Sequence, residues 1–79
     1  MPRTLRSARH EAMRALLVAG RKAATLTQAQ LAKRIGRYQS FIADVERGQR
    51  RVDVVEFLEI VEALEIDPAK AIRKISLSR

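Results

Sequence analysis

Three segments of this chain carry the sequence pattern that starts an α-helix. Thr27 can accept a hydrogen bond at a helix N-terminus, and Gln30, three residues later, can close a capping box. Asp53 and Glu56 repeat this pattern, and the pair Asp67-Pro68 places a capping residue directly before a proline at the first helical position. Apolar residues at helical spacing follow each start, so the sequence predicts short helices joined by short connections.

The periodicity of the apolar residues extends these starts to five helices. We expect them over about residues 7–22, 28–35, 38–47 and 54–65, and from residue 68 onward. Gly36 and Gly48 should end the second and third helices, because glycine takes a left-handed conformation without strain. No segment shows a β-hairpin pattern, so the predicted fold class is all-α. The expected core face of the fourth helix contains Val54, Phe57, Leu58, Val61 and Leu64.

The length and composition fit one small domain that needs no cofactor. A chain of 79 residues leaves no room for a second core. We divide it into a basic N-terminal arm (residues 1–6, with Arg3 and Arg6), a single domain (residues 7–76, with its motif at about 27–47) and a frayed tail (residues 77–79). The absence of cysteine and the single histidine argue against a metal site. No apolar run approaches the length of a membrane span, so we expect a cytoplasmic protein without membrane contact.

The net charge of +7 is unevenly distributed along the chain. Residues 1–51 contain 12 Arg or Lys and 3 acidic residues, whereas residues 52–79 contain 4 Arg or Lys and 6 acidic residues. A basic body with a mildly acidic end indicates a polyanionic partner on one side. A solvated surface that keeps the protein in solution is the alternative explanation of the same charges.

The second and third expected helices are separated by only about three residues, and this spacing forces a steep crossing. Such a crossing needs a small residue where the helices meet and a glycine in the turn, and Ala32 and Gly36 occupy these positions. These requirements describe a DNA-binding helix-turn-helix, with an αα-hairpin that has no DNA role as the alternative. Apolar side chains must also fill the angle between the helices, and the candidates are Leu31, Ile35, Ile42 and Val45.

The same segment resembles the phage repressor/Cro-type (XRE) helix-turn-helix family. The resemblance is carried by residues 26–32 (LTQAQLA), 39–42 (QSFI) and 46–48 (ERG), and it extends through residues 53–57 to residues 67–68. It covers roughly residues 13–75. It implies a compact, five-helix, lambda-repressor-like domain that binds operator sites on double-stranded DNA, usually as a homodimer.

The first residues of the third helix are the candidates for contacts with base edges in the major groove. A glutamine such as Gln39 can pair with adenine, Ser40 can bond to several bases, and Tyr38 shares this end of the helix. The resemblance implies that Gln39 and Ser40 read bases, and that Gln28 contacts phosphate and braces the glutamine of the next helix. Four arginines flank this surface as candidate phosphate contacts: Arg37, Arg47, Arg50 and Arg51.

Two further candidate base-reading residues on the exposed face of the third helix leave alternatives open. Asp44 lies one turn after Ser40, where many family members carry a basic or amide residue. Its carboxylate could accept a hydrogen bond from cytosine, pair with a nearby arginine, or act against wrong sequences. Phe41 could contact a thymine methyl group or a sugar, or it could pack on the fourth helix.

Other charged and apolar residues are expected to have structural roles. The resemblance implies an ion pair between Arg21 on the first helix and Glu46 at the end of the third. Four acids recur every three residues on the fourth helix, and we expect them on a solvated face turned away from DNA: Glu56, Glu59, Glu62 and Glu65. The last two helices contain more apolar residues than one small core can bury, which gives candidates for a dimer surface: Ile60, Ile72, Ile75 and Leu77.

These features favour a sequence-specific, dimeric DNA-binding regulator, with a repressor as the leading hypothesis. The alternative is an antitoxin-type interaction module that binds a toxin through its apolar fifth helix and regulates itself through DNA. The sequence contains no nucleophile with a paired base, no metal ligand set and no glycine-rich phosphate loop. We therefore do not expect an enzyme.

Overall fold

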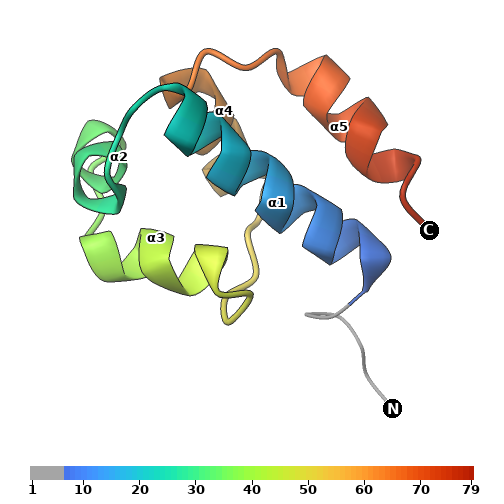
Figure 1. Cartoon of the computed structure of the whole chain (residues 1–79), viewed down its shortest axis with the longest axis horizontal. Helices are drawn as coiled ribbons and strands as arrows, with labels where there is room; N and C mark the ends of the chain where they lie inside the picture. Colours follow the sequence, from blue (N-terminus) through green and yellow to red (C-terminus); the bar gives the residue numbers. More distant parts are fainter. Residues whose placement is uncertain (1–6) are drawn as a thin grey trace.

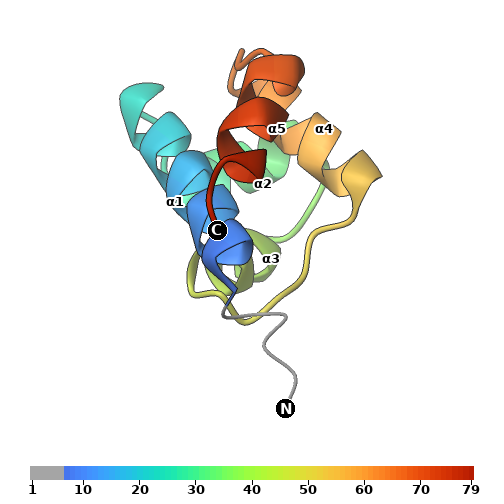
Figure 2. The same ribbon diagram turned by 90° about the vertical axis from the view of Figure 1, so that its right-hand side faces the viewer.

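The computed structural model describes residues 7–79, which fold into α-helices joined by short connections (Figures 1 and 2). This part of the chain contains no strand, so the predicted all-α class is confirmed. In both views α3 and α5 lie at opposite edges of the domain. The expected basic arm, with Arg3 and Arg6, lies outside the described residues. The helices are α1 (Ala8–Ala23), α2 (Gln28–Arg34), α3 (Gln39–Glu46), α4 (Val54–Ala63) and α5 (Pro68–Ser76).

Local side-chain caps fix the starts of α1, α2, α4 and α5, and in α1 the cap is Ser7, which accepts a hydrogen bond from the N–H of His10. Thr27 and Gln30 form the predicted capping box of α2, with hydrogen bonds of 3.1 and 2.9 Å to the two backbone N–H groups. Asp53 and Glu56 form the equivalent box of α4, and Asp67 accepts a hydrogen bond from the first turn of α5. The predicted starts of these three helices are therefore confirmed. Within residues 7–79, none of the helices combines the length and hydropathy that a membrane crossing requires.

Four helices end on a residue in the left-handed conformation. Gly36 and Gly48, with φ of 70° and 76°, end α2 and α3 as predicted. Thr25 and Glu65 take the same conformation after α1 and α4, with φ of 56° and 58°. At each end, two successive backbone N–H groups return to carbonyls of the last turn, which is the Schellman arrangement. The fourth helix consequently ends at Ala63 and not at residue 65.

The core face of α4 agrees only in part with the one expected from sequence: Phe57, Val61 and Leu64 are buried as predicted, whereas Val54 and Leu58 are not. Its buried side chains are Phe57, Ile60, Val61 and Leu64, which lie three or four residues apart on one stripe. Val54, expected in the core, is 74% exposed, whereas Ile60, expected on a dimer surface, is only 1% exposed. Ile60 belongs to the core because this stripe faces the rest of the domain. It is therefore removed from the candidate dimer surface.

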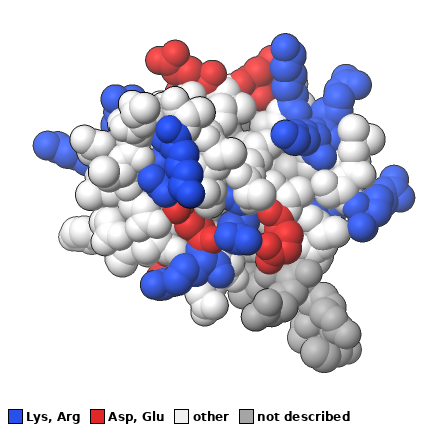
Figure 3. Space-filling view, in the orientation of Figure 1, with Lys and Arg blue, Asp and Glu red and all other residues white. Residues whose placement is uncertain are grey.

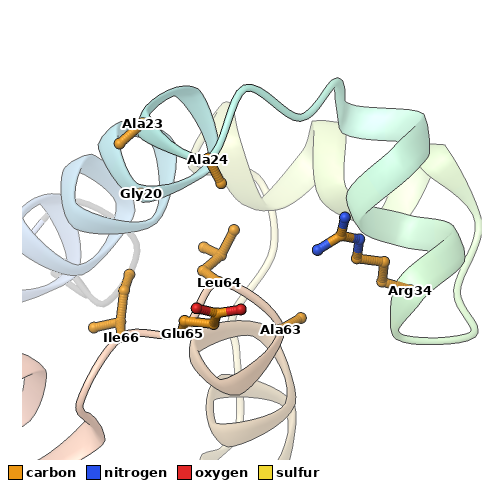
Figure 4. Close-up of a pocket in the computed structure, with 8 residues that line it drawn as sticks. All are labelled: Gly20, Ala23, Ala24, Arg34, Ala63, Leu64, Glu65 and Ile66. Atoms are coloured by element: carbon orange, nitrogen blue, oxygen red, sulfur yellow. The ribbon is translucent and has the colours of Figure 1, made fainter.

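A glycine in α1 allows a close approach to the connection between α4 and α5. A Cβ atom on Gly20 would lie 2.7 Å from Cδ1 of Ile66 and 3.2 Å from Cδ1 of Leu64. Figure 4 shows these two side chains below Gly20, in an open pocket of about 400 Å³ whose far side holds Arg34. The absence of a side chain at position 20 therefore allows α1 and the α4–α5 connection to pack this closely.

Candidate nucleic-acid interface

The α2–α3 pair has the geometry of a helix-turn-helix. Only residues 35–38 separate the two helices, with Gly36 in the left-handed conformation that the turn requires. Both helices contribute to the same core, which fixes the angle between them. The buried apolar side chains of this motif are Leu31, Ala32, Ile42 and Val45, which leaves the other face of α3 in solvent.

The first turn of α3 presents polar side chains to solvent. Tyr38, the N-cap residue, is 86% exposed, and Gln39 and Ser40 are also exposed. Gln39 is held in place: its Nε2 donates a 2.8 Å hydrogen bond to Oε1 of Gln28. Nε2 of Gln28 in turn donates a 2.8 Å hydrogen bond to Oε1 of Glu46. Gln28 thus links the exposed end of α3 to a carboxylate at its buried end.

This chain of hydrogen bonds has only one possible direction. The Glu46 carboxylate is an acceptor, so Gln28 must turn its NH₂ group toward it and its carbonyl oxygen toward Gln39. Gln39 must then supply the donor. Its own carbonyl oxygen and second N–H have no other partner among residues 7–79, and this donor–acceptor pair matches the edge of adenine.

Arg21 and Glu46 form the ion pair that the family resemblance implies. Nε and Nη2 of Arg21 donate to the two carboxylate oxygens at 2.6 and 3.0 Å, and Nη1 donates to the carbonyl of Leu26 at 2.8 Å. Burial alone would raise the pKa of Glu46, but the hydrogen bonds from Arg21 and Gln28 and the positive charge of Arg21 outweigh it. The pKa of Glu46 therefore lies below its ordinary value, and the pair stays charged while it ties α1 to α3.

Asp44 is paired with an arginine on the exposed face of α3. Its Oδ1 accepts a hydrogen bond from Nη2 of Arg47, one turn later on the same helix. Of the three alternatives for Asp44, the pairing with a nearby arginine is the one that the folded domain contains. Figure 3 shows opposite charges side by side elsewhere on one face of the molecule, where several Lys or Arg side chains lie directly beside Asp or Glu.

Arg37 and Arg50, two of the candidate phosphate contacts, share a single carboxylate. Nη1 of Arg37 and Nη2 of Arg50 donate to Oε2 of Glu56 at 3.1 and 2.7 Å. Both guanidinium groups also lie over the ring of Phe41, at 4.7 and 4.9 Å from its centre. Phe41 is half-buried and packs against the core, which favours its packing role. Glu56 is buried, so the expectation that it lies on a solvated face is wrong.

Two more arginines, Arg51 and Arg14, lie near α3 or contact it, and the sequence did not indicate the role of Arg14. Arg51 is exposed and has no ion pair within residues 7–79. Arg14 donates from Nη1 to the backbone carbonyl of Glu46 at 2.6 Å and pairs with Glu11. It therefore braces the C-terminal end of α3 from α1. Its basic charge could not reveal this role, because 32 residues separate it from its partner.

An apolar surface lies away from α3, between the start of α4 and the exposed side of α5. Ile72 and Leu77 are exposed there, and so are Val54 and Val55. A groove of about 230 Å³ separates the two helices. Ile75 lines this groove together with Met13, Val52, Asp53, Val54, Phe57, Leu58 and Ile72. Three of the four candidates for a dimer surface are thus accessible, and only Ile60 is not.

The fold and this exposed helix define the class of DNA-binding helix-turn-helix domains. The family model described as Helix-turn-helix (HTH_3) matches residues 17–70 of the chain. An XRE-family like protein from Pseudomonas syringae pv. tomato is similar to it, with 40% identity over 87% of this chain and 84% of that one, and a TM-score of 0.82. The chain therefore belongs to the XRE family of helix-turn-helix transcriptional regulators.

Two further solved structures are similar to this chain. The restriction-modification controller protein C.AhdI from Aeromonas hydrophila is 37% identical over 75% of this chain and 86% of its own, with a TM-score of 0.69. The clp gene regulator ClgR from Corynebacterium glutamicum shares the fold, with a TM-score of 0.77 over 89% of this chain and 90% of its own at 23% identity. The comparison with curated proteins gave no significant match.

Proposed function

We propose that this chain is a sequence-specific repressor that binds its operator as a homodimer, with α3 in the major groove. The observation that carries the proposal is the braced amide of Gln39 at the exposed end of α3. A fixed donor–acceptor pair discriminates between bases better than a freely rotating one, because the wrong base leaves a polar group unpaired. On this proposal Tyr38, Gln39 and Ser40 face bases, and the protein acts in the cytoplasm on chromosomal or phage DNA.

The phosphate contacts come from the arginines around α3. Arg51 is exposed, Arg47 is exposed but paired with Asp44, and Arg37 and Arg50 keep most of their donors free beside Phe41. Such contacts fix the register of the protein on the duplex, while the base contacts supply the specificity. A single domain of this size makes few contacts, so useful affinity needs two domains on two half-sites.

The homodimer is supported by the apolar surface of α4 and α5. Exposed Val54 and Ile72 line a groove that a second copy could fill in an isologous contact, and Val55 and Leu77 are further exposed apolar side chains of the same two helices. Ile72→Glu should shift the protein toward the monomer in analytical ultracentrifugation and weaken operator binding. Lys70→Gln, which lowers the net charge by the same one unit at an exposed position on the same helix, is the control. If the Ile72→Glu protein dimerises like the wild type, the dimer surface does not include this groove.

The direct test is selection of binding duplexes from a random pool at about 0.15 M salt, where non-specific binding is screened. We expect an inverted repeat with half-site centres about one helical turn apart, containing adenine at the base read by Gln39. Gln39→Ala should then lose operator affinity while binding to random duplexes is retained. An equal loss on both kinds of duplex would contradict the assignment of Gln39 to a base.

A second candidate function is a module that binds a protein partner, such as a toxin, through the same groove. The observation that favours it is the extent of exposed apolar side chains on so small a domain. Purification from the native host separates the two candidates. A stoichiometric heterologous partner, together with no recovered DNA motif, would favour the module over the dimeric repressor.

A further inference from the structure

Three residues from separate parts of the chain meet beside the first turn of α3. Arg37 comes from the turn before α3, Arg50 from the loop after it, and Glu56 from the first turn of α4. One oxygen of Glu56, Oε1, accepts the capping hydrogen bond from the N–H of Asp53 at 3.0 Å. The other, Oε2, accepts hydrogen bonds from both arginines. A single carboxylate thus fixes the start of α4 and two guanidinium groups.

The three side chains of this cluster differ in burial: the acid is buried and the two arginines are partly exposed. The Glu56 side chain is 9% exposed, whereas those of Arg37 and Arg50 are 33% and 43% exposed. Both guanidinium carbons lie within 4.9 Å of the centre of the Phe41 ring, which supports them from the domain side. Arg37 also has Glu59 at 3.6 Å, which is beyond hydrogen-bond distance. The two arginines are therefore held by Glu56 and Phe41 on the side of the domain, and their other side is accessible to solvent.

We propose that Glu56 is a positioning residue for DNA binding, which holds Arg37 and Arg50 as one preformed clamp for a backbone phosphate. Each guanidinium group carries five N–H donors and uses one on Glu56, so most donors of the pair remain available. Two arginines against one shared carboxylate carry one net positive charge, which Glu59 at 3.6 Å from Arg37 offsets only from the exposed side, and guanidinium groups match the oxygens of a phosphate in pairs. The proposal rests on the proposed DNA-binding function, because the ligand is the phosphate of a duplex.

The clamp and simple charge neutralisation predict opposite effects of the same substitution. Glu56→Gln raises the net charge by one, so if Glu56 only neutralises the arginines, binding to any duplex should become tighter. If Glu56 positions them, the freed arginines must be ordered at the moment of binding, and affinity should fall about tenfold despite the added charge. Glutamine also closes capping boxes, so the start of α4 is retained.

The experiment measures the affinity of the full chain for a random duplex and for its operator across a salt series. Glu62→Gln is the matched control, because it makes the same charge change on α4, and Glu62 is exposed without an ion pair within residues 7–79. We expect Glu62→Gln to bind at least as tightly as the wild type, and Glu56→Gln to bind about tenfold more weakly to both duplexes. Equal affinities of the two variants would overturn the positioning role.

Two additional measurements keep the test decisive. In an Arg37→Ala/Arg50→Ala background, Glu56→Gln should cause no further loss of affinity, because the groups through which it acts are gone. A further loss in that background would overturn the clamp. If circular dichroism shows that Glu56→Gln does not fold, Glu56→Asp replaces it, with the same charge but a shorter reach, and wild-type affinity of that variant would count against the clamp. If neither the wild type nor Glu62→Gln binds any duplex, the proposed function itself fails.

Discussion

Removing either partner of the Arg21–Glu46 pair is expected to destabilise the domain by about 3–5 kcal/mol. The two side chains are only 13% and 9% exposed, so water cannot replace the lost partner of the remaining charge unless the domain opens. A chain of 79 residues typically has a free energy of unfolding of roughly 4–12 kcal/mol. A single substitution should therefore remove a large share of the total stability.

A double-mutant cycle followed by urea unfolding measures this interaction. The single variants are Arg21→Met and Glu46→Leu, and the third variant combines them. Replacing both charges with apolar residues of similar volume is often close to neutral, so the double variant should be much more stable than the sum of the two single losses indicates. Gln28 loses its acceptor in the double variant, but it is only partly buried, so water can replace Glu46 as its partner.

The reasoning about this pair fails if each single variant costs less than about 1 kcal/mol, which is the value of an exposed pair. Additive losses in the double variant would also refute it, because they would mean that the two charges do not stabilise each other. The unfolding transition of each variant must remain two-state with an unchanged slope for the comparison to hold.

Three other perturbations test separate parts of the structure. Since the pKa of Glu46 is lowered in the folded state, its stabilising contribution is present above its unfolded pKa of about 4.3 and is lost as the pH falls through the folded value. The urea midpoint should therefore fall in acid, and the same fall in Glu46→Gln would exclude Glu46 as its source. Asp44→Asn should free Arg47 for phosphate and steepen the salt dependence of duplex binding by about 0.9; a changed base preference at unchanged slope would instead show that Asp44 contacts a base. Glu65→Gly should raise the free energy of unfolding by about 1 kcal/mol by relieving a left-handed residue, whereas Glu62→Gly inside α4 should lower it by about as much.

The helix starts could be predicted from sequence because each cap is made within three residues. Thr27 with Gln30 and Asp53 with Glu56 need no partner from elsewhere in the chain. The helix ends were predicted only where a glycine marks them. α1 and α4 end on Thr25 and Glu65, and the residue after each, Leu26 or Ile66, packs against the core. That tertiary packing imposes the left-handed conformation on residues that do not favour it, and no local pattern indicates it.

The orientation of α4 shows a second limit of local patterns. The predicted core face contains Val54, Phe57, Leu58, Val61 and Leu64, whereas the buried stripe contains Phe57, Ile60, Val61 and Leu64. Both stripes satisfy the helical period, and their centres differ by a fraction of a turn. Packing of α4 against α1, α2 and α5 selects the second stripe and leaves Val54 and Leu58 to line the groove. The error over Ile60 follows directly, because a residue assigned to the wrong side of a helix is also assigned to the wrong surface.

The residue types of the candidate interface could be predicted from local patterns, but its pairings could be predicted only where the family resemblance implied them, as for Arg21 with Glu46 and Gln28 with Gln39. The partners of Gln28 and Arg21 lie 18 and 25 residues away, on a helix whose rotation the sequence does not give. Glu56 shows that a recognised motif does not account for every contact of a side chain. The capping box accounts for one carboxylate oxygen and therefore seemed to explain the residue, while the second oxygen holds two arginines. Glu46 likewise binds Arg21, and Asp44 binds Arg47. The acids around α3 therefore do not simply oppose a basic surface: each fixes the direction of an arginine, and it is direction, more than the number of charges, that a phosphate or a base edge can recognise.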